Sequence, residues 1–212
     1  MDHTRDKNWK TRIRKRLETI LGKEYVISSE EELIAFECDG LTNYRIKPVF
    51  AVLPNSTQQV SDVVRLCHEE SIPFVPRGAG TGLSGGALPT EQGIIISLSR
   101  MNRILETDIE NRFVVVEPGV VNNWVTRAVS PYGYYYAPDP SSQVVCTIGG
   151  NVAENSGGVH CLKYGVTTNH VLGVEMVLPD GEIIYAGGKA QDQTGYDILG
   201  LIVGAEGLLG IE

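Results

Sequence analysis

The sequence is poor in the residues that build metal centres and disulfide frameworks, and it lacks a long apolar run. It has four cysteines and four histidines among 212 residues, and Cys38, Cys67, Cys146 and Cys161 are widely spaced, with no C-x-x-C pair. This spacing argues against a structural zinc site and against a disulfide framework, so we expect buried free thiols. No uninterrupted apolar run approaches the length of a membrane-spanning helix.

Positive charge is also scarce. The formal net charge is −8, which argues against a general nucleic-acid-binding surface. The polar, basic N-terminus has no apolar signal core, so the cytoplasm is the expected location. Basic residues gather within 5–16, where Trp9, Ile13, Leu17 and Leu21 recur at four-residue spacing and predict an amphipathic helix docked by its apolar stripe. The alternative for this helix is a peripheral contact with a membrane or a partner.

Apolar patterns and turn residues predict an α+β fold with two lobes. Ser56 and Gln59 have the spacing of a capping box, which marks the start of a helix. With the buried strand at 49–53 before it and the strand at 72–75 after it, this helix forms a β-α-β unit whose two strands should be parallel. Further strands are predicted at 94–98, 104–107, 113–116, 174–178 and 183–185, and further helices at 29–36 and 121–129. We therefore expect a small βαβ lobe followed by a larger, mostly antiparallel lobe.

The strongest local signal is residues 76–86, which we call the first glycine loop. It holds five glycines in nine residues directly after a predicted strand. The backbone of such a loop can approach a ligand closely and turn several N–H groups toward a pyrophosphate. The candidate binding residues in it are Pro76, Arg77, Gly78, Ala79, Gly80, Thr81, Gly82, Leu83, Ser84 and Gly85.

Two other interpretations of this loop exist. Gly80 to Gly85 spells G-x-G-x-x-G, the pattern of a nicotinamide-dinucleotide site, but that site requires a helix that starts inside the motif. Only residues 87–93 separate the motif from the next strand, and Pro89 lies among them, so no helix of useful length fits and we reject the nicotinamide site. On this loop alone, a purely structural role stays open.

A second polar stretch, residues 138–165, changes the balance, and we call it the second glycine segment. Gly149 and Gly150 predict a turn before a short apolar helix, and Gly157 and Gly158 predict its end. We expect a second set of free N–H groups here, so that a long ligand with a pyrophosphate, a ribityl chain and polar ring edges would use both sets. The candidates are Pro138, Asp139, Pro140, Ser142, Thr147, Gly149, Gly150, Asn151, Glu154, Asn155, Gly157, Gly158, Tyr164 and Gly165.

These segments carry a resemblance to a known family. With 163–167 and 204–211, they resemble the FAD-binding domain of the vanillyl-alcohol oxidase and p-cresol methylhydroxylase superfamily, nearest to its glycolate oxidase flavin subunit and D-lactate dehydrogenase branch. The similarity covers about residues 10–212. It implies an N-terminal helical segment at 1–44 and a p-cresol methylhydroxylase-type FAD-binding domain at 45–212.

The resemblance also implies roles for the motifs. The first glycine loop would wrap the FAD pyrophosphate, residues 149–158 would lie along pyrophosphate and flavin, and a last motif with Glu206, Gly207, Gly210 and Ile211 would close over the cofactor. Some superfamily members attach the flavin covalently through a histidine in the first loop. Thr81 corresponds to that position here, so noncovalent FAD is expected.

The implied reaction is oxidation of a 2-hydroxy acid such as glycolate or D-lactate, with electrons passing through the flavin to a separate acceptor. In the relatives a substrate-binding cap domain follows the last motif, and we expect it to be absent here. The chain alone should then be inactive, and a homodimer or a partner subunit would supply the missing half. The alternative is a non-catalytic flavin-binding subunit or remnant. His160 and His170 are expected to have structural hydrogen-bonding roles, and neither a catalytic residue nor a metal site is assigned.

Overall fold

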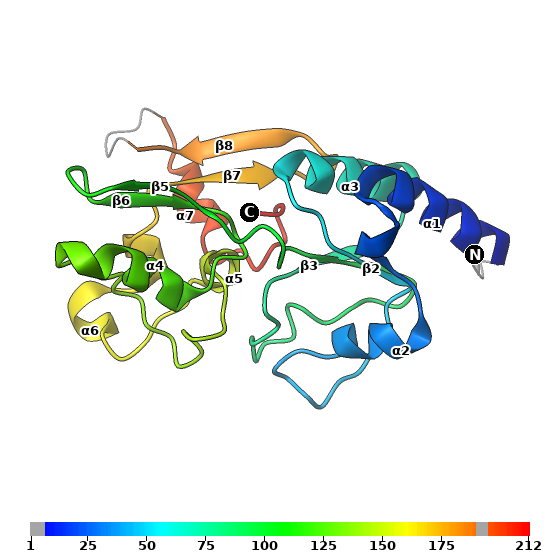
Figure 1. Cartoon of the computed structure of the whole chain (residues 1–212), viewed down its shortest axis with the longest axis horizontal. Coiled ribbons are helices and arrows are strands. Elements are labelled where there is room, and N and C mark those ends of the chain that lie inside the picture. The colour runs from blue at the N-terminus through cyan, green and yellow to red at the C-terminus, as the bar shows by residue number, and fades with distance from the viewer. Residues whose placement is uncertain (1–6, 190–194) are drawn as a thin grey trace.

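The computed structural model describes residues 7–189 and 195–212, which form two halves that lie side by side (Figure 1). The first half runs to about residue 101. Its elements are α1 (Lys7–Leu21), η1 (Lys23–Tyr25), β1 (Val26–Ile27), α2 (Glu30–Leu33), η2 (Ile34–Phe36), β2 (Phe50–Val52), α3 (Thr57–Glu69), β3 (Phe74–Arg77) and β4 (Ile94–Ser97).

Strands β1 to β4 form one mixed sheet in the order β1-β2-β4-β3. Both β2 and β3 are parallel to β4, with Phe50 and Phe74 both opposite Ile94, so the two strands of the predicted β-α-β unit are parallel as expected. They are not neighbours, because β4 lies between them. The edge position of β3 fits its one proline, Pro76, which has no N–H group to donate to a ladder.

The core of this half explains its sequence. Strands β2 and β4 are buried along their whole length, which accounts for runs of apolar residues without alternation. Helix α3 begins at the Ser56 cap, whose side chain accepts from Gln59 N, and packs Val60, Val63 and Val64 into the same core as Ile13 of α1. Each such side chain contributes roughly 1.5–3 kcal/mol when fully buried.

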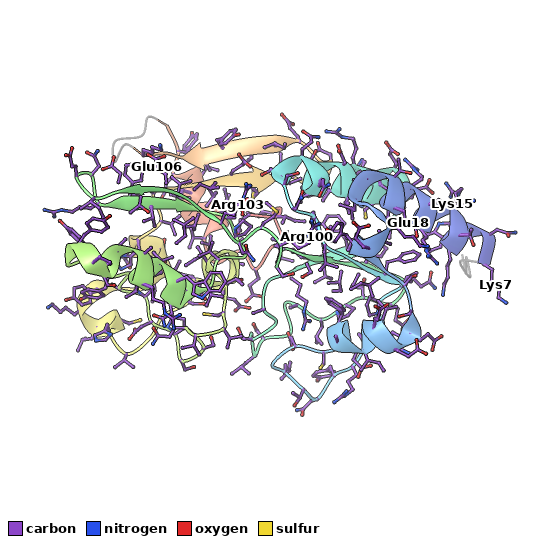
Figure 2. The ribbon with its side chains drawn as sticks, in the orientation of Figure 1. Lys7, Lys15, Glu18, Arg100, Arg103 and Glu106 are labelled. Atoms are coloured by element: carbon purple, nitrogen blue, oxygen red, sulfur yellow. The ribbon has the colours of Figure 1, made fainter. Side chains whose placement is uncertain are left out.

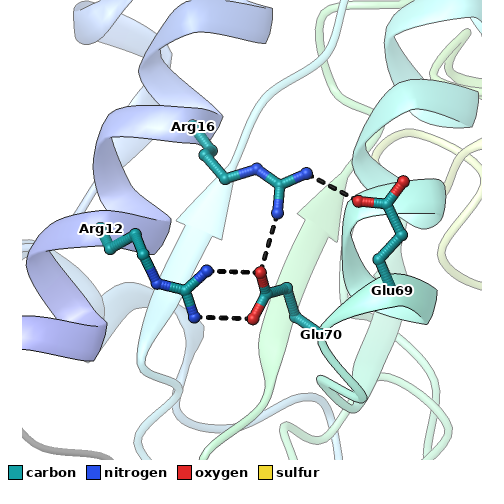
Figure 3. A network of polar contacts seen from close by, with 4 residues as sticks. All are labelled: Arg12, Arg16, Glu69 and Glu70. Atoms are coloured by element: carbon teal, nitrogen blue, oxygen red, sulfur yellow. Dashed lines mark hydrogen bonds and ion pairs between the residues drawn. The ribbon is translucent and has the colours of Figure 1, made fainter.

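Part of the basic face of α1 is paired rather than free in solvent. Arg12 forms a two-pronged ion pair with Glu70, at 2.5 and 2.8 Å, and Arg16 bridges Glu69 and Glu70 at 2.7 and 2.8 Å (Figure 3). These contacts and the apolar stripe dock α1 on α3. The pKa of Glu70 is lowered, chiefly by its hydrogen bond from Arg12.

The second half is built from two antiparallel hairpins and short helices, as predicted. Strand β5 pairs with β6 and β7 pairs with β8, and the β7–β8 hairpin turns at Gly181, whose φ is +87°. The elements are β5 (Ile104–Asp108), β6 (Phe113–Val116), α4 (Asn122–Val129), η3 (Ser130–Tyr132), α5 (Ile148–Glu154), α6 (Cys161–Tyr164), η4 (Thr167–Asn169), β7 (Gly173–Val177), β8 (Ile183–Gly187) and α7 (Ile198–Ile202).

The two halves are joined by direct contacts as well as by the chain. The Ser61 hydroxyl of α3 donates to Gly181 O in the β7–β8 turn at 2.5 Å. Within the first half, Arg100 (labelled in Figure 2) donates to Leu53 O at 2.7 Å, and its guanidinium carbon lies 3.3 Å from the centre of the Tyr25 ring.

Candidate cofactor site

The first glycine loop leaves β3 at Arg77 and contains no helix before β4 begins, which agrees with the rejection of a nicotinamide site. Its main chain is largely unused by the protein itself. Within the described residues, no N–H group of residues 78–87 donates a hydrogen bond to another protein group. A glycine-rich loop with free N–H groups has the donor set that binds phosphate oxygens.

The Arg77 side chain is engaged inside the first half. Its Nη1 donates to Cys38 O at 2.8 Å and to Ala87 O at 3.2 Å, and the guanidinium lies 5.9 Å from the centre of the Phe36 ring. Burial lowers the pKa of Arg77. The free donors that this loop presents are therefore main-chain N–H groups rather than the Arg77 guanidinium.

The first glycine pair of the second glycine segment differs from its prediction. Gly149 and Gly150 form the first turn of α5, not a turn before it, and their N–H groups are already bonded. Gly149 N donates to Pro118 O at 2.9 Å, and Gly150 N donates to the side chain of the helix cap Thr147 at 3.4 Å. The prediction of a second free set of donors at these two glycines is wrong. A Cβ on Gly149 would lie 2.7 Å from Pro118 Cβ, so close packing explains the glycine there.

The two segments nevertheless lie against each other. A Cβ on Gly78 would lie 2.3 Å from Thr147 Oγ1. Ser84 Oγ donates to the carboxylate of Glu154 at 3.0 and 3.1 Å, and Glu154 Oε1 would be 3.2 Å from a Cβ on Gly82. The structure thus brings the first glycine loop together with both ends of α5.

The Pro138–Ser142 turn is tied to the chain after α5. A Cβ on Gly158 would lie 2.0 Å from Asp139 O, so the two backbones touch. His160 Nδ1 lies 2.6 Å from Asp139 Oδ2, and His160 N donates to Asp139 Oδ1 at 3.3 Å. Burial acts to raise the pKa of Asp139, but the hydrogen bonds from His160 outweigh it and leave that pKa lowered.

The other residues of the second segment have mainly internal partners. Pro138 O accepts from Asn122 Nδ2 at 3.0 Å, and Asn155, at the end of α5, accepts from Thr168 N at 2.9 Å. His170 Nε2 lies 2.9 Å from Tyr164 O, so both histidines make the expected hydrogen bonds. The main-chain carbonyls of Pro140 and Ser142 accept hydrogen bonds from N–H groups that follow within residues 143–146. Asn151 is buried in α5, and Gly157 packs on Cys161. Gly165 is the residue at which α6 ends.

Helix α6, with Tyr164 and Gly165 at its end, lies beyond α5 as seen from β3 (Figure 1). Cys161 and Cys38 are only partly buried, whereas Cys67 and Cys146 are buried, so the expected burial of the free thiols is correct for two of the four.

The last motif docks on α5 and reaches β3. Gly204 N donates to Val152 O at 2.9 Å, and Glu206 N donates to Ala153 O at 2.8 Å. A Cβ on Gly207 would lie 3.0 Å from Pro76 Cγ. Gly210 packs on Met176, and Ile211 exchanges two main-chain hydrogen bonds with Val177, each 2.8 Å long. The last motif therefore contacts both halves, through α5 and β7 on one side and Pro76 of β3 on the other.

One segment near the first glycine loop was not a candidate in the sequence. Main-chain atoms of Gly40 lie so close to the loop that a Cβ there would be 2.6 Å from Gly82 O. The Asp39-Gly40 dipeptide is an ordinary turn signal, and no local pattern indicates its distant partner.

Among the described residues, no group of three or more His, Cys, Asp or Glu side chains is arranged to hold a metal ion. In the same residues, no helix has the length and apolar character required to cross a membrane.

Comparison with known proteins decides the family. The sequence profile of a family described as "FAD binding domain" matches residues 48–187. The chain belongs to this FAD-binding domain family. FAD is therefore its cofactor, and the residues present fit it: unused N–H groups in the first glycine loop, with glycines where side chains would block close approach.

Curated relatives show which kinds of protein the chain is similar to in sequence. The chain is 50% identical over 186 residues to glycolate oxidase subunit GlcD of Escherichia coli (strain K12), a match covering 88% of this chain and 37% of that protein. GlcD of Bacillus subtilis (strain 168) is 44% identical over 200 residues, or 94% of this chain and 43% of the relative. A D-lactate dehydrogenase of Anaerostipes hadrus is 43% identical over 178 residues, or 83% and 37%. The chain thus spans about two fifths of the length of these relatives.

Solved structures confirm the fold. A p-cresol methylhydroxylase with substrate bound superimposes with a TM-score of 0.81 at 22% identity, covering 97% of this chain and 42% of that one. An alkyldihydroxyacetonephosphate synthase gives 0.82 at 23% identity, covering 95% and 38%. The predicted α+β fold of the p-cresol methylhydroxylase type is correct.

Proposed function

We propose that the chain holds FAD noncovalently, with the main-chain N–H groups of residues 78–87 binding the pyrophosphate, and that it serves an oxidoreductase acting on 2-hydroxy acids. The observation that carries the first part is the unused set of N–H groups beside Thr147 and Glu154. The second part rests on the similarity to GlcD and D-lactate dehydrogenase. When bound, FAD supplies the redox chemistry by accepting a hydride equivalent.

The residues of this chain bind and orient the cofactor. In this proposal the first glycine loop holds the phosphates, and Glu154 fixes the loop against α5 through Ser84. Thr81 stands where some superfamily members have a flavin-linked histidine, and a threonine cannot form that imidazole bond. Substrate-positioning groups then come from protein outside these 212 residues, in the same chain or in a partner subunit.

The cofactor assignment is tested by loading the protein with FAD and denaturing it in acid. We expect flavin absorbance that titrates to one FAD per chain and leaves completely with the supernatant. Flavin that stays with the denatured protein would overturn the noncovalent assignment.

The activity assignment is tested by anaerobic mixing of this FAD-loaded polypeptide with glycolate or D-lactate while flavin absorbance is followed. We expect no rapid bleaching, because positioning of the reactants supplies roughly 7–11 kcal/mol of barrier reduction. Bleaching should appear when a protein that supplies the part of GlcD not matched by this chain is added. Bleaching by the 212 residues alone would show that they carry their own substrate site, and no bleaching in either case would favour a non-catalytic flavin-binding subunit.

A further inference from the structure

Residues 38–41, which precede the region matched by the family, contact the first glycine loop. The family match begins at residue 48, yet Cys38 O accepts a hydrogen bond from Arg77 at 2.8 Å. A Cβ on Gly40 would lie 2.6 Å from Gly82 O and 2.8 Å from Thr81 O. Only a glycine lets the two backbones approach this closely, so residues 38–41 and the loop fix each other's position.

Arg77 ties together three parts of this region. One nitrogen, Nη1, donates both to Cys38 O and to Ala87 O, which lie before the loop and at its far end. The other, Nη2, fills the space beside Gly80, where a Cβ would be only 2.3 Å away and φ is +68°. The guanidinium thus fastens the beginning of the loop to its end and to residue 38.

Asp39 supports this arrangement electrostatically. It is 5% exposed, and its Oδ1 accepts from Leu41 N at 2.8 Å, which closes a tight turn around Gly40. Its negative charge favours the charged form of Arg77, which burial disfavours. Asp39 Oδ2 has no hydrogen-bond partner within the described chain. The electrostatic attraction to Arg77 therefore offsets part of the cost of burying this carboxylate.

We propose that residues 38–41 and Arg77 form a clasp that preorganises the first glycine loop for FAD, with Arg77 and Gly40 as positioning residues rather than phosphate ligands. This inference rests on the proposed role of the loop in binding the pyrophosphate. A glycine-rich loop without the clasp samples many conformations, and ordering it would be subtracted from the free energy of FAD binding. With the clasp, the N–H groups of residues 78–87 are held in place before the ligand arrives.

The competing role for Arg77 is a direct charge contact with the phosphates. To make it, the guanidinium would have to leave Cys38 O and Ala87 O. The two roles differ in their response to salt, because a direct ion contact is screened and a main-chain positioning effect is not. The dependence of the FAD dissociation constant on salt therefore separates them.

The experiment compares Arg77→Met, Arg77→Lys and Gly40→Ala with two matched controls, Arg127→Met on the exposed face of α4 and Gly188→Ala, where nothing lies within 4 Å of the added Cβ. FAD affinity is titrated at several salt concentrations, and NMR order parameters of the backbone amides of residues 78–87 are measured in the apoprotein. We expect Arg77→Met and Gly40→Ala to weaken FAD binding about tenfold or more, and Arg77→Lys to weaken it less. The salt slope should stay that of the wild type, while the order parameters of the loop amides fall.

A salt slope that becomes flatter in Arg77→Met would overturn the proposal, because it would identify Arg77 as a phosphate ligand. Unchanged affinity in Arg77→Met and Gly40→Ala would overturn it as well. If Arg77→Met fails to fold, Arg77→Gln, which also removes the charge but keeps a side-chain N–H donor, decides by the same slope and order parameters. Gly82→Val tests the loop itself: if it keeps FAD, the loop is not the pyrophosphate site, whereas loss there with no effect in the clasp variants rejects only the clasp.

Discussion

The two glycine-rich regions of this protein look alike in sequence and differ in structure. In the first glycine loop the N–H groups of residues 78–87 have no protein acceptor in the described chain, whereas at the start of α5 Gly149 and Gly150 are bonded to Pro118 and Thr147. In the second segment, Gly157 and Gly158 lie against Cys161 and Asp139. In the second segment glycine therefore serves close packing of chain on chain. In the first loop Gly78 and Gly80 also lie against protein groups, at Thr147 and Arg77, but the free N–H groups there are the feature that the proposed FAD binding requires.

The largest effect is expected where glycine packs backbone on backbone. Gly158→Ala places a Cβ 2.0 Å from Asp139 O, and we expect the apoprotein to lose about 3 kcal/mol of unfolding free energy, the upper end for overpacking. Gly188→Ala is the control, with a change within about 0.5 kcal/mol. Denaturant unfolding of both variants measures the difference, and an unaffected Gly158→Ala protein would remove the packing role.

The reverse pattern is expected in the first loop. Gly82→Val meets only the carboxylate tip of Glu154, at 3.2 Å, so the stability of the apoprotein should change little. The branched side chain hinders close approach of a ligand, and FAD affinity should fall about 100-fold, or ~2.7 kcal/mol. Flavin titration and thermal unfolding of the same sample measure both quantities, with Gly188→Val as control. Tight FAD binding by the variant would sink the loop assignment.

The second segment, unlike the first loop, should respond to acid through Asp139. Its folded-state pKa is lowered, so it stabilises the fold above its unfolded pKa near 3.9 and loses that contribution as pH falls through the folded value. Because His160 is exposed, the contribution is at most about 1 kcal/mol. We expect Asp139→Asn to flatten the fall of stability between about pH 5 and pH 3, whereas Asp180→Asn, in the β7–β8 turn, leaves it unchanged. Equal slopes in both variants would contradict this.

The smallest effect concerns salt. The first loop offers main-chain dipoles, and its neighbouring cation Arg77 is engaged with Cys38 and Ala87. We expect the FAD dissociation constant to change less than about threefold between roughly 0.05 and 0.5 M salt. Titration in a neutral salt measures this, and a steep loss of affinity would indicate a lysine and arginine site instead.

Local patterns in the sequence were sufficient for most elements. Capping at Ser56, apolar runs at β2 and β4 and the turn at Gly181 depend on neighbouring residues, and the predicted helices and strands lie where expected. The position of β4 between β2 and β3 depends on long-range pairing, which no local pattern encodes. The same reason explains why the approach of Gly40 to the loop was not predicted.

For the candidate site, the sequence located the glycines but not their partners. Whether an N–H group is free depends on carbonyls elsewhere, such as Pro118 O and Val120 O, which cover the start of α5. The docking of Arg12 and Arg16 on Glu70 is a further case, because charge composition alone favoured exposed basic residues. The roles of individual residues in FAD binding stay predictions.

The parallel pairing of β3 with β4 has a dynamic consequence. Neighbouring parallel strands require a crossover connection, usually a helix, but here residues 78–93 make it without one. The entropy of closing this connection is therefore borne by the same residues that we propose bind the cofactor. Ligand binding and sheet assembly are thus linked, and hydrogen exchange along this crossover should slow on addition of FAD while the β7–β8 hairpin, closed by its own tight turn, exchanges as before.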